Sequence, residues 1–185
     1  MIDTIQKDAA EKMQHAVDFV REDMATIRTG RAHPAMFNKI NAEYYGAPTP
    51  LQQLAQFTSP DPRSLLITPF DRSAIGAIEK AIRDSDLGVN PSNDGNSVRI
   101  IVPQLTEERR KEYIKLAKGK AEDARIAVRN VRRHAIDSLK KLQKDGEISE
   151  DELSRAEKSL DGTTRKYVDG IDDLLKHKEA ELLEI

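Results

Sequence analysis

The sequence predicts an α+β protein with an L-shaped outline, in which an elongated three-helix bundle carries a small inserted β/α/β domain. Near both ends of the 185-residue chain, apolar residues recur every three or four positions, as they do on one face of a helix. The stretch between these ends collects the prolines and contains short apolar runs typical of strands. Aromatic residues make up only 4% of the chain, so the helices are expected to pack mainly through Leu, Ile, Val and Ala.

The first helix is expected to run from Ile2 to the region of Ile27. The spacing of its apolar residues keeps one face apolar for about seven turns. Gly30 is expected to end it as a C-cap, because glycine readily takes the left-handed conformation found there. The apolar positions are Ile2, Ile5, Ala9, Met13, Ala16, Val20, Met24 and Ile27.

The next segment, from Arg31 to Leu105, is predicted to form the inserted domain. Apolar runs at residues 65–67 and 98–102 are expected to be strands, since both are short and lie just before a proline. Between them, isoleucines at helical spacing predict a helix from Ser73 to Asp86, with Gly88 suited to its C-terminal cap.

A tight turn is predicted at Asp94-Gly95, because glycine tolerates the positive φ that such turns require. The surrounding residues superficially resemble a calcium-binding loop. Such a loop ends on a bidentate glutamate, however, and Ile101 occupies that position. The hairpin is therefore the preferred interpretation.

Two further helices are predicted after this domain. Thr106 is a suitable N-cap for the first, which should end near Gly146. Ser149 and Glu152 have the spacing of a capping box, which predicts the start of the last helix. Helices that are apolar on one side only must pack on each other, so the three long helices are expected to form one bundle.

The bundle is assigned to residues 1–30 and 106–185, and the inserted domain to residues 31–105. Two short connections would then join the domains, so rotating one domain against the other should cost little free energy. We expect a hinge whose angle changes in use, formed by Gly30, Arg31, Pro103, Gln104 and Leu105.

Basic residues gather between Arg109 and Lys144. This window contains thirteen Lys and Arg but only four acidic residues, although the whole chain carries a net charge of −2. Four arginines within this window fall on one stripe of a helix, and guanidinium groups in a stripe can contact phosphates. Alternatively, they pair with acidic residues of a neighbouring helix or are simply solvated. These arginines are Arg125, Arg129, Arg132 and Arg133.

Five short segments stand out along the chain: Thr26 to Pro34, Tyr44 to Gly46, Asp86 to Pro91, Pro103 to Arg110, and Arg129 to Arg133. In this order they resemble motifs of the bacterial ribosome recycling factor family, and the resemblance covers essentially the whole chain. His134 is a small departure, since the family often has an acidic residue there.

This resemblance implies a non-enzymatic factor that binds the post-termination ribosome through large-subunit ribosomal RNA. With elongation factor G and GTP, it would promote subunit dissociation. We also expect a monomer, and we expect it to recognise RNA by shape, because the stripe has no interleaved aromatics. The absence of cysteine suits a cytoplasmic protein. The residues indicate neither a metal site nor a cofactor site. The residues implied to contact ribosomal RNA are Arg28, Arg31, Arg110, Arg129, Arg132 and Arg133.

Other classes of protein fit the sequence less well. No apolar run is long enough for a membrane span, no secretory or transit signal is evident, and the chain has no cysteine for disulfides or thiolate chemistry. The four histidines lack convincing ligand spacing. A coiled-coil adaptor remains as a rival, since the last helix contains heptads, and an enzyme sited in the inserted domain remains as another, although that domain shows no catalytic motif.

Overall fold

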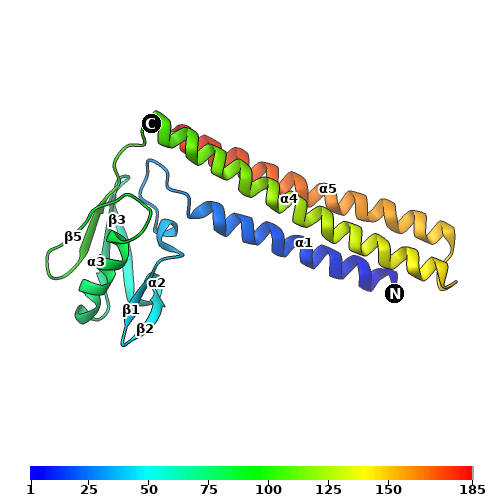
Figure 1. Cartoon of the computed structure of the whole chain (residues 1–185), viewed down its shortest axis with the longest axis horizontal. Coiled ribbons are helices and arrows are strands. Elements are labelled where there is room, and N and C mark those ends of the chain that lie inside the picture. Colours follow the sequence, from blue (N-terminus) through cyan, green and yellow to red (C-terminus); the bar gives the residue numbers. More distant parts are fainter. Residues whose placement is uncertain (185) are drawn as a thin grey trace. The chain divides into compact units, whose positions relative to one another are not determined.

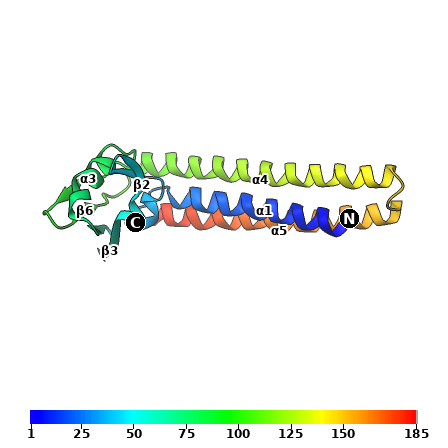
Figure 2. The same cartoon turned by 90° about the horizontal axis from the view of Figure 1, so that it is seen from below.

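A computed structural model describes residues 1–184 as a mixed α+β protein. Within these residues, three long helices lie side by side (Figures 1 and 2). They are α1 (Ile2–Ala25), α4 (Glu107–Lys144) and α5 (Glu150–Leu183). The described part of the chain contains no helix with both the length and the apolar character that crossing a bilayer requires.

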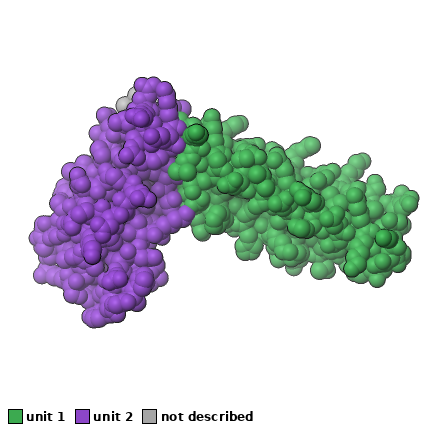
Figure 3. Space-filling model, viewed as in Figure 1, with its two compact units in different colours: residues 1–24, 114–179 green, residues 25–113, 180–185 purple. Residues whose placement is uncertain are grey.

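The chain divides into two compact units (Figure 3). Unit 1 comprises residues 1–24 and 114–179, and unit 2 comprises residues 25–113 together with the C-terminal residues from Ala180. Both α4 and α5 therefore contribute residues to both units. The domain limits expected from the sequence, at residues 30/31 and 105/106, stay a prediction.

Unit 1 is held together by the apolar faces of its helices. The expected spacing on α1 is confirmed, since Met13, Val20 and Met24 are buried. Their partners on α4 include small residues such as Ala121, which allow the helices to approach closely. Complete burial of a side chain such as Met13 contributes roughly 1.5–3 kcal/mol. The remaining buried members of the two unit 1 clusters are Ala9, Val17, Ala124, Val128, Ala135, Leu139, Ala156, Leu160 and Ile171.

The predicted helix caps of α4 and α5 are confirmed. The hydroxyl of Thr106 accepts a hydrogen bond from the backbone N–H of Arg109 at 3.1 Å. Ser149 and Glu152 exchange the two bonds of a capping box, at 3.1 and 3.2 Å. Gly146, after the end of α4, has a φ of +77°, as a helix terminator of this kind requires.

The predicted C-cap at Gly30 is wrong. Helix α1 ends at Ala25, five residues earlier. Among the described glycines, positive φ values occur at Gly46, Gly88, Gly95 and Gly146. The chain leaves the helix early because the side chains of Arg28 and Thr29 bond to loop backbone: Arg28 reaches distant carbonyls, and Thr29 Oγ1 accepts from the N–H of Arg31.

Unit 2 contains a four-stranded antiparallel sheet, of order β3-β4-β6-β5 in the described chain, and a separate hairpin of β1 and β2. The predicted strands at residues 65–67 and 98–102 are confirmed as β4 and β6, the two central strands. The others were not predicted. The strand bounds are β1 Asn41–Tyr44, β2 Ala47–Pro50, β3 Ala55–Asp61, β4 Ser64–Pro69, β5 Pro91–Asn93 and β6 Val98–Ile101.

Helix α3 (Ile75–Arg83) packs on this sheet and is shorter than expected. It ends three residues before the predicted Asp86, so Gly88 is not its cap, although Gly88 does have a φ of +68° in the chain that follows. Ile78 and Ile82 are fully buried with Leu65 and Ile100 of the sheet. Shorter elements complete the unit: the single turn α2 (Leu51–Leu54) and the 3₁₀ segments Pro34–Phe37 and Arg72–Ala74.

The predicted turn at Asp94-Gly95 is confirmed as the hairpin that joins β5 to β6. The carboxylate of Asp94 accepts hydrogen bonds from the N–H groups of Asn96 and Ser97, both at 2.9 Å. These bonds lower the pKa of Asp94 below its usual value. Gly95 has a φ of +88°. The residues suggestive of a calcium loop are therefore explained by turn geometry.

Candidate nucleic-acid interface

The arginine stripe predicted from spacing lies on α4, within unit 1. Its four members differ in how tightly they are held by other side chains. An exposed guanidinium can exchange water for phosphate at little cost, whereas one enclosed by carboxylates has fewer donors left for phosphate. The neighbours of each arginine therefore decide how much of the stripe can contact nucleic acid.

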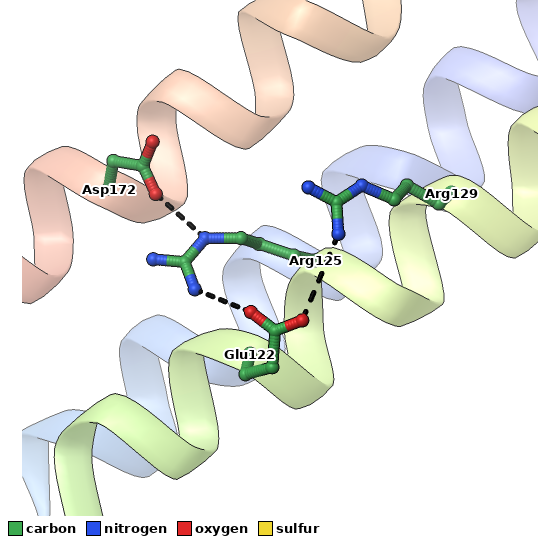
Figure 4. Close-up of polar contacts among 4 residues, drawn as sticks. All are labelled: Glu122, Arg125, Arg129 and Asp172. Atoms are coloured by element: carbon green, nitrogen blue, oxygen red, sulfur yellow. Dashed lines mark hydrogen bonds and ion pairs between the residues drawn. The ribbon is translucent and has the colours of Figure 1, made fainter. Parts of the chain in front are cut away.

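Arg125 is the most enclosed of the four, with 17% of its side chain exposed. Figure 4 shows its guanidinium between two carboxylates: Nε donates to Asp172 of α5 at 2.7 Å, and NH1 donates to Glu122 at 2.9 Å. Burial opposes the charged form, but the two carboxylates outweigh it and raise the pKa of Arg125. Arg125 thus ties α4 to α5.

Arg132 makes a second tie between these helices. Its Nε donates to Asp161 of α5 at 2.7 Å, and 39% of its side chain remains exposed. The alternative that the stripe pairs with a neighbouring helix is therefore correct for Arg125 and Arg132. Because Arg132 keeps NH1 and NH2 beyond the atom bonded to Asp161, it retains donors for a further acceptor.

Arg129 and Arg133 make no such ion pair with α5 among the described residues. Arg129 is 55% exposed, and its closest carboxylate, on Glu122, is 3.8 Å away (Figure 4). Arg133 is exposed and donates to the neutral side chain of Asn130 at 3.1 Å. The 3.8 Å ion pair of Arg129 with Glu122 stabilises little on a helix surface, and Arg133 has no carboxylate partner among the described residues. Both guanidinium groups can therefore contact an anionic partner.

Arg28, the first of the three predicted contact residues in unit 2, is buried, with only 7% exposed. Its NH2 donates to the carbonyl of Pro103 at 2.5 Å and its NH1 to that of Leu87 at 3.4 Å, while Nε is buried without a hydrogen-bond partner among the described residues. Burial lowers the pKa of Arg28. The geometry is that of a side chain that joins three loops.

Arg31 and Arg110 line a pocket of about 310 Å³ in unit 2. Arg31 is exposed and lies 3.3 Å from the carboxylate of Glu184. Arg110 is half-buried, and its Nε has no partner among residues 1–184. Four of the five predicted hinge residues line this pocket: Gly30, Arg31, Gln104 and Leu105. The fifth, Pro103, accepts a hydrogen bond from Arg28 through its carbonyl.

Sequence reasoning did not identify the carboxylates that bind the stripe. A signal was present: Asp161 and Asp172 are eleven residues apart, which is slightly more than three full helical turns, so they lie on one side of α5. Nor did it identify the ion pair between Lys120 and Asp23, at 2.7 Å, which joins α4 to α1. Residues 1–184 contain no group of three His, Asp or Glu side chains arranged to hold a metal ion.

A family model described as ribosome recycling factor matches residues 20–183, most of the chain. The chain belongs to the ribosome recycling factor family. It is 65% identical over 185 residues to the ribosome-recycling factor of Streptomyces coelicolor, with both chains covered in full. It is 68% identical over 181 residues to that of Cutibacterium acnes, with 98% of each chain covered. The resemblance inferred from the five motifs is thereby confirmed.

Solved structures of the family are also similar to this chain. A solution structure of a ribosome recycling factor has 40% identity and a TM-score of 0.80, with 100% of this chain and 98% of the other covered. A second has 44% identity and a TM-score of 0.72, with both chains covered in full. That structure shows the T. thermophilus ribosome recycling factor and the E. coli elongation factor G bound to the E. coli post-termination complex. The α+β fold class is confirmed.

Proposed function

We propose that this chain recycles ribosomes: it binds the post-termination ribosome through large-subunit ribosomal RNA and, with elongation factor G and GTP, promotes dissociation of the subunits. Family membership supports the role, and one structural relative, described together with elongation factor G on the post-termination complex, supports both partners. The chain would act in the cytoplasm by binding alone, with no covalent chemistry of its own.

The exposure of Arg129 and Arg133 is the observation that carries the RNA-binding part of this proposal. Both lie in the window from Arg109 to Lys144, where basic residues outnumber acidic ones thirteen to four. Each guanidinium that meets a phosphate releases condensed counterions, which gives affinity without base-specific contacts. Arg132 can join them through its unused NH1 and NH2 atoms.

The other predicted contacts have different roles in this proposal. Arg31 and Arg110 line an open pocket, so they can reach an anion. Arg28 is buried against backbone carbonyls, and we propose that it acts by holding the loops that carry Arg31 and Pro103. Arg125 holds α5 against α4 and keeps the stripe in place.

We also propose that the division expected from the sequence describes the moving parts: a bundle of residues 1–30 and 106–185, an inserted domain of residues 31–105, and a hinge of Gly30, Arg31, Pro103, Gln104 and Leu105. A disulfide engineered across these connections should impair subunit splitting but not ribosome binding. Unimpaired splitting with the disulfide fully formed would exclude a moving hinge.

The decisive experiment is binding to isolated large ribosomal subunits over a salt series. Arg133→Ala should weaken binding and reduce the slope of log K against log salt by about one unit, because one phosphate contact is lost. Arg165→Ala is the matched control, since Arg165 is equally a surface arginine of unit 1 but lies on α5 outside the window. Asp161→Asn should strengthen binding, because it releases Arg132. If all three bind like the wild type, the stripe does not contact RNA.

A further inference from the structure

A groove of about 730 Å³ runs between α1 and α4 of unit 1, and the proposed RNA contacts do not use it. Its depth comes from small side chains: Ala16 on α1, and Ala124 and Ala127 on α4, leave room that larger residues would fill. Val20 adds to the apolar base of the groove. Concave apolar surfaces between helices are common binding sites for a further helix or segment.

Phe19 stands at the edge of this groove with 68% of its surface exposed. On α4, Leu116 is 47% exposed and lies one turn before Lys120, which lines the groove. Neither side chain is needed to complete the buried clusters of unit 1. Exposed aromatic residues beside an apolar hollow are typical anchors in protein interfaces.

Carboxylates surround the apolar base. Asp18, Glu22, Asp23 and Asp123 line the groove, against His15 and Lys120, and Lys120 pairs with Asp23 at 2.7 Å. Asp18 is engaged locally by Gln14 and Arg21. Glu22 and Asp123 have no ion pair with any residue from 1 to 184 and are exposed. The groove therefore presents uncompensated negative charge next to Phe19.

This groove and the arginine stripe occupy opposite sides of α4. Residues two apart on an α-helix differ by about 200°, so Ala127, in the groove, points away from Arg129. The negative charge of the groove would repel a nucleic acid, whose phosphates the stripe attracts. The chemistry that complements the groove is an apolar side chain flanked by Lys or Arg, which indicates a protein segment.

We propose that the groove between α1 and α4 is a docking site for a basic amphipathic segment of a partner protein, which packs an apolar side chain against Phe19 and over Ala16 and Ala124 and sets its basic residues against Glu22 and Asp123. This inference does not depend on the proposed function. RNA binding by the stripe and protein binding by the groove can be tested separately on the same folded chain.

The test uses a fluorescent synthetic helix of about eighteen residues, with leucines on one face and lysines on the other. Its binding to the full chain is measured by anisotropy. Phe19→Ala should weaken binding about tenfold, as loss of an interface anchor does. The double variant Glu22→Gln with Asp123→Asn should weaken it by a similar factor at low salt and by less at high salt, because the ion pairs are screened.

Matched controls separate the groove from general surface effects. Phe70→Ala removes another exposed phenylalanine, from unit 2, and Glu147→Gln with Asp169→Asn removes two exposed carboxylates of unit 1 outside the groove. Neither should change binding. Circular dichroism checks that each variant folds, which is expected because the altered side chains are exposed.

Several results would overturn the proposal. The helix could fail to bind, bind equally to the groove and control variants, or be displaced by a single-stranded RNA oligonucleotide. Sedimentation of the chain alone supplies another: a dimer that Phe19→Ala abolishes would assign the groove to a second copy of this chain. Binding of the basic helix that only the groove variants weaken, with the chain monomeric, supports a protein partner.

Discussion

The two units hold their polar side chains by different means. In unit 2 these side chains bond largely to backbone: Arg28 donates to two carbonyls, and Asp94 accepts from two N–H groups. In unit 1 they bond to each other across helices, as Arg125 does with Asp172 and Lys120 with Asp23. Helices use up their own backbone donors and acceptors, whereas loops leave theirs to be satisfied by side chains.

This difference has an energetic consequence. When a side chain that satisfies buried backbone is removed, the backbone group loses a partner that water cannot easily replace. When one member of a surface ion pair is removed, the other simply returns to water. Polar substitutions should therefore be more costly in unit 2 than in unit 1, unless they affect a helix end.

The largest effect is expected for Arg28→Ala in unit 2. It leaves the carbonyls of Leu87 and Pro103 without their donor and opens a cavity, so the free energy of unfolding should fall by about 3 kcal/mol. Urea denaturation measures this change. Arg31→Ala is the control, because its exposed side chain should change stability by less than about 0.5 kcal/mol. Equal small losses would remove the proposed difference between the units.

A smaller effect is expected for Arg125→Ala in unit 1, where the guanidinium is held between Asp172 and Glu122. The loss should be about 1–2 kcal/mol, since the site is only partly enclosed. Arg125→Met keeps most of the apolar stem and separates packing from charge. A double-mutant cycle with Asp172→Ala gives the coupling directly. A coupling near zero would mean that this tie does not stabilise the bundle.

Helix ends are where unit 1 does use backbone contacts, and Ser149→Ala tests them. Loss of the bond from the N–H of Glu152 should lower the free energy of unfolding by about 1 kcal/mol. Ser138→Ala is the matched control: Ser138 lies inside α4 and bonds to the carbonyl of His134, so alanine should be neutral or slightly stabilising there. The two variants can be compared by thermal unfolding, and identical melting temperatures would argue against the capping box.

The smallest effect concerns a side-chain pair in unit 2. The hydroxyl of Tyr44 donates to Asp71 at 2.6 Å, and this bond raises the pKa of Tyr44 to about 12 and lowers that of Asp71. Because the folded state keeps this proton longer than the unfolded state, stability should fall as pH rises from the ordinary tyrosine value of about 10 through about 12. Tyr44→Phe should remove that fall.

A direct check of this pair is an NMR titration of Tyr44. In the Asp71→Asn variant its pKa should move back towards the ordinary value, because the carboxylate that holds the proton is gone. On the acid side, the lowered pKa of Asp71 contributes stability that is lost as pH falls below about 4. An unchanged titration of Tyr44 in the variant would show that the bond is absent in solution.

The long helices could be predicted because their signals are local. Apolar spacing, the cap at Thr106, the glycine at Gly146 and the capping box at Ser149 all act within a few residues of one another. The end of α1 was missed because it depends on Arg28 and its distant partner, the carbonyl of Pro103. A sequence does not reveal which of its arginines will find such a partner.

The strands of unit 2 also divide into those with a local sequence signal and those that depend on distant partners. The central strands β4 and β6 carry apolar runs and were predicted, although Pro69 ends β4. Strands β2, β3 and β5 were missed because they contain prolines and no such apolar run. Edge strands tolerate proline because one side of their backbone has no neighbour. That β3 and β5 are edges is a property of the sheet order, which the sequence does not display.

Charge and spacing pointed to the stripe on α4, and the family resemblance pointed to Arg28 and Arg31, but neither divided the candidate site into its parts. Arg129, Arg132 and Arg133 look equivalent in the sequence, as Arg28 and Arg31 do. The positions of Asp161 on α5 and of the backbone carbonyls around Arg28 distinguish them. Counting arginines identifies a surface, whereas assigning their roles requires the neighbours.

The order of the helices along the chain also affects how the protein is made. Helix α1 is synthesised first, yet its apolar face is buried with residues as distant as Ile171. At the usual pace of bacterial synthesis, the ribosome needs on the order of 10 s to reach those residues. The buried cluster of unit 2 lies within residues 32–102 and is complete well before then. A nascent chain should thus complete its sheet while the apolar side of α1 is still exposed to solvent. During that interval, binding of a chaperone to α1 would protect the chain most.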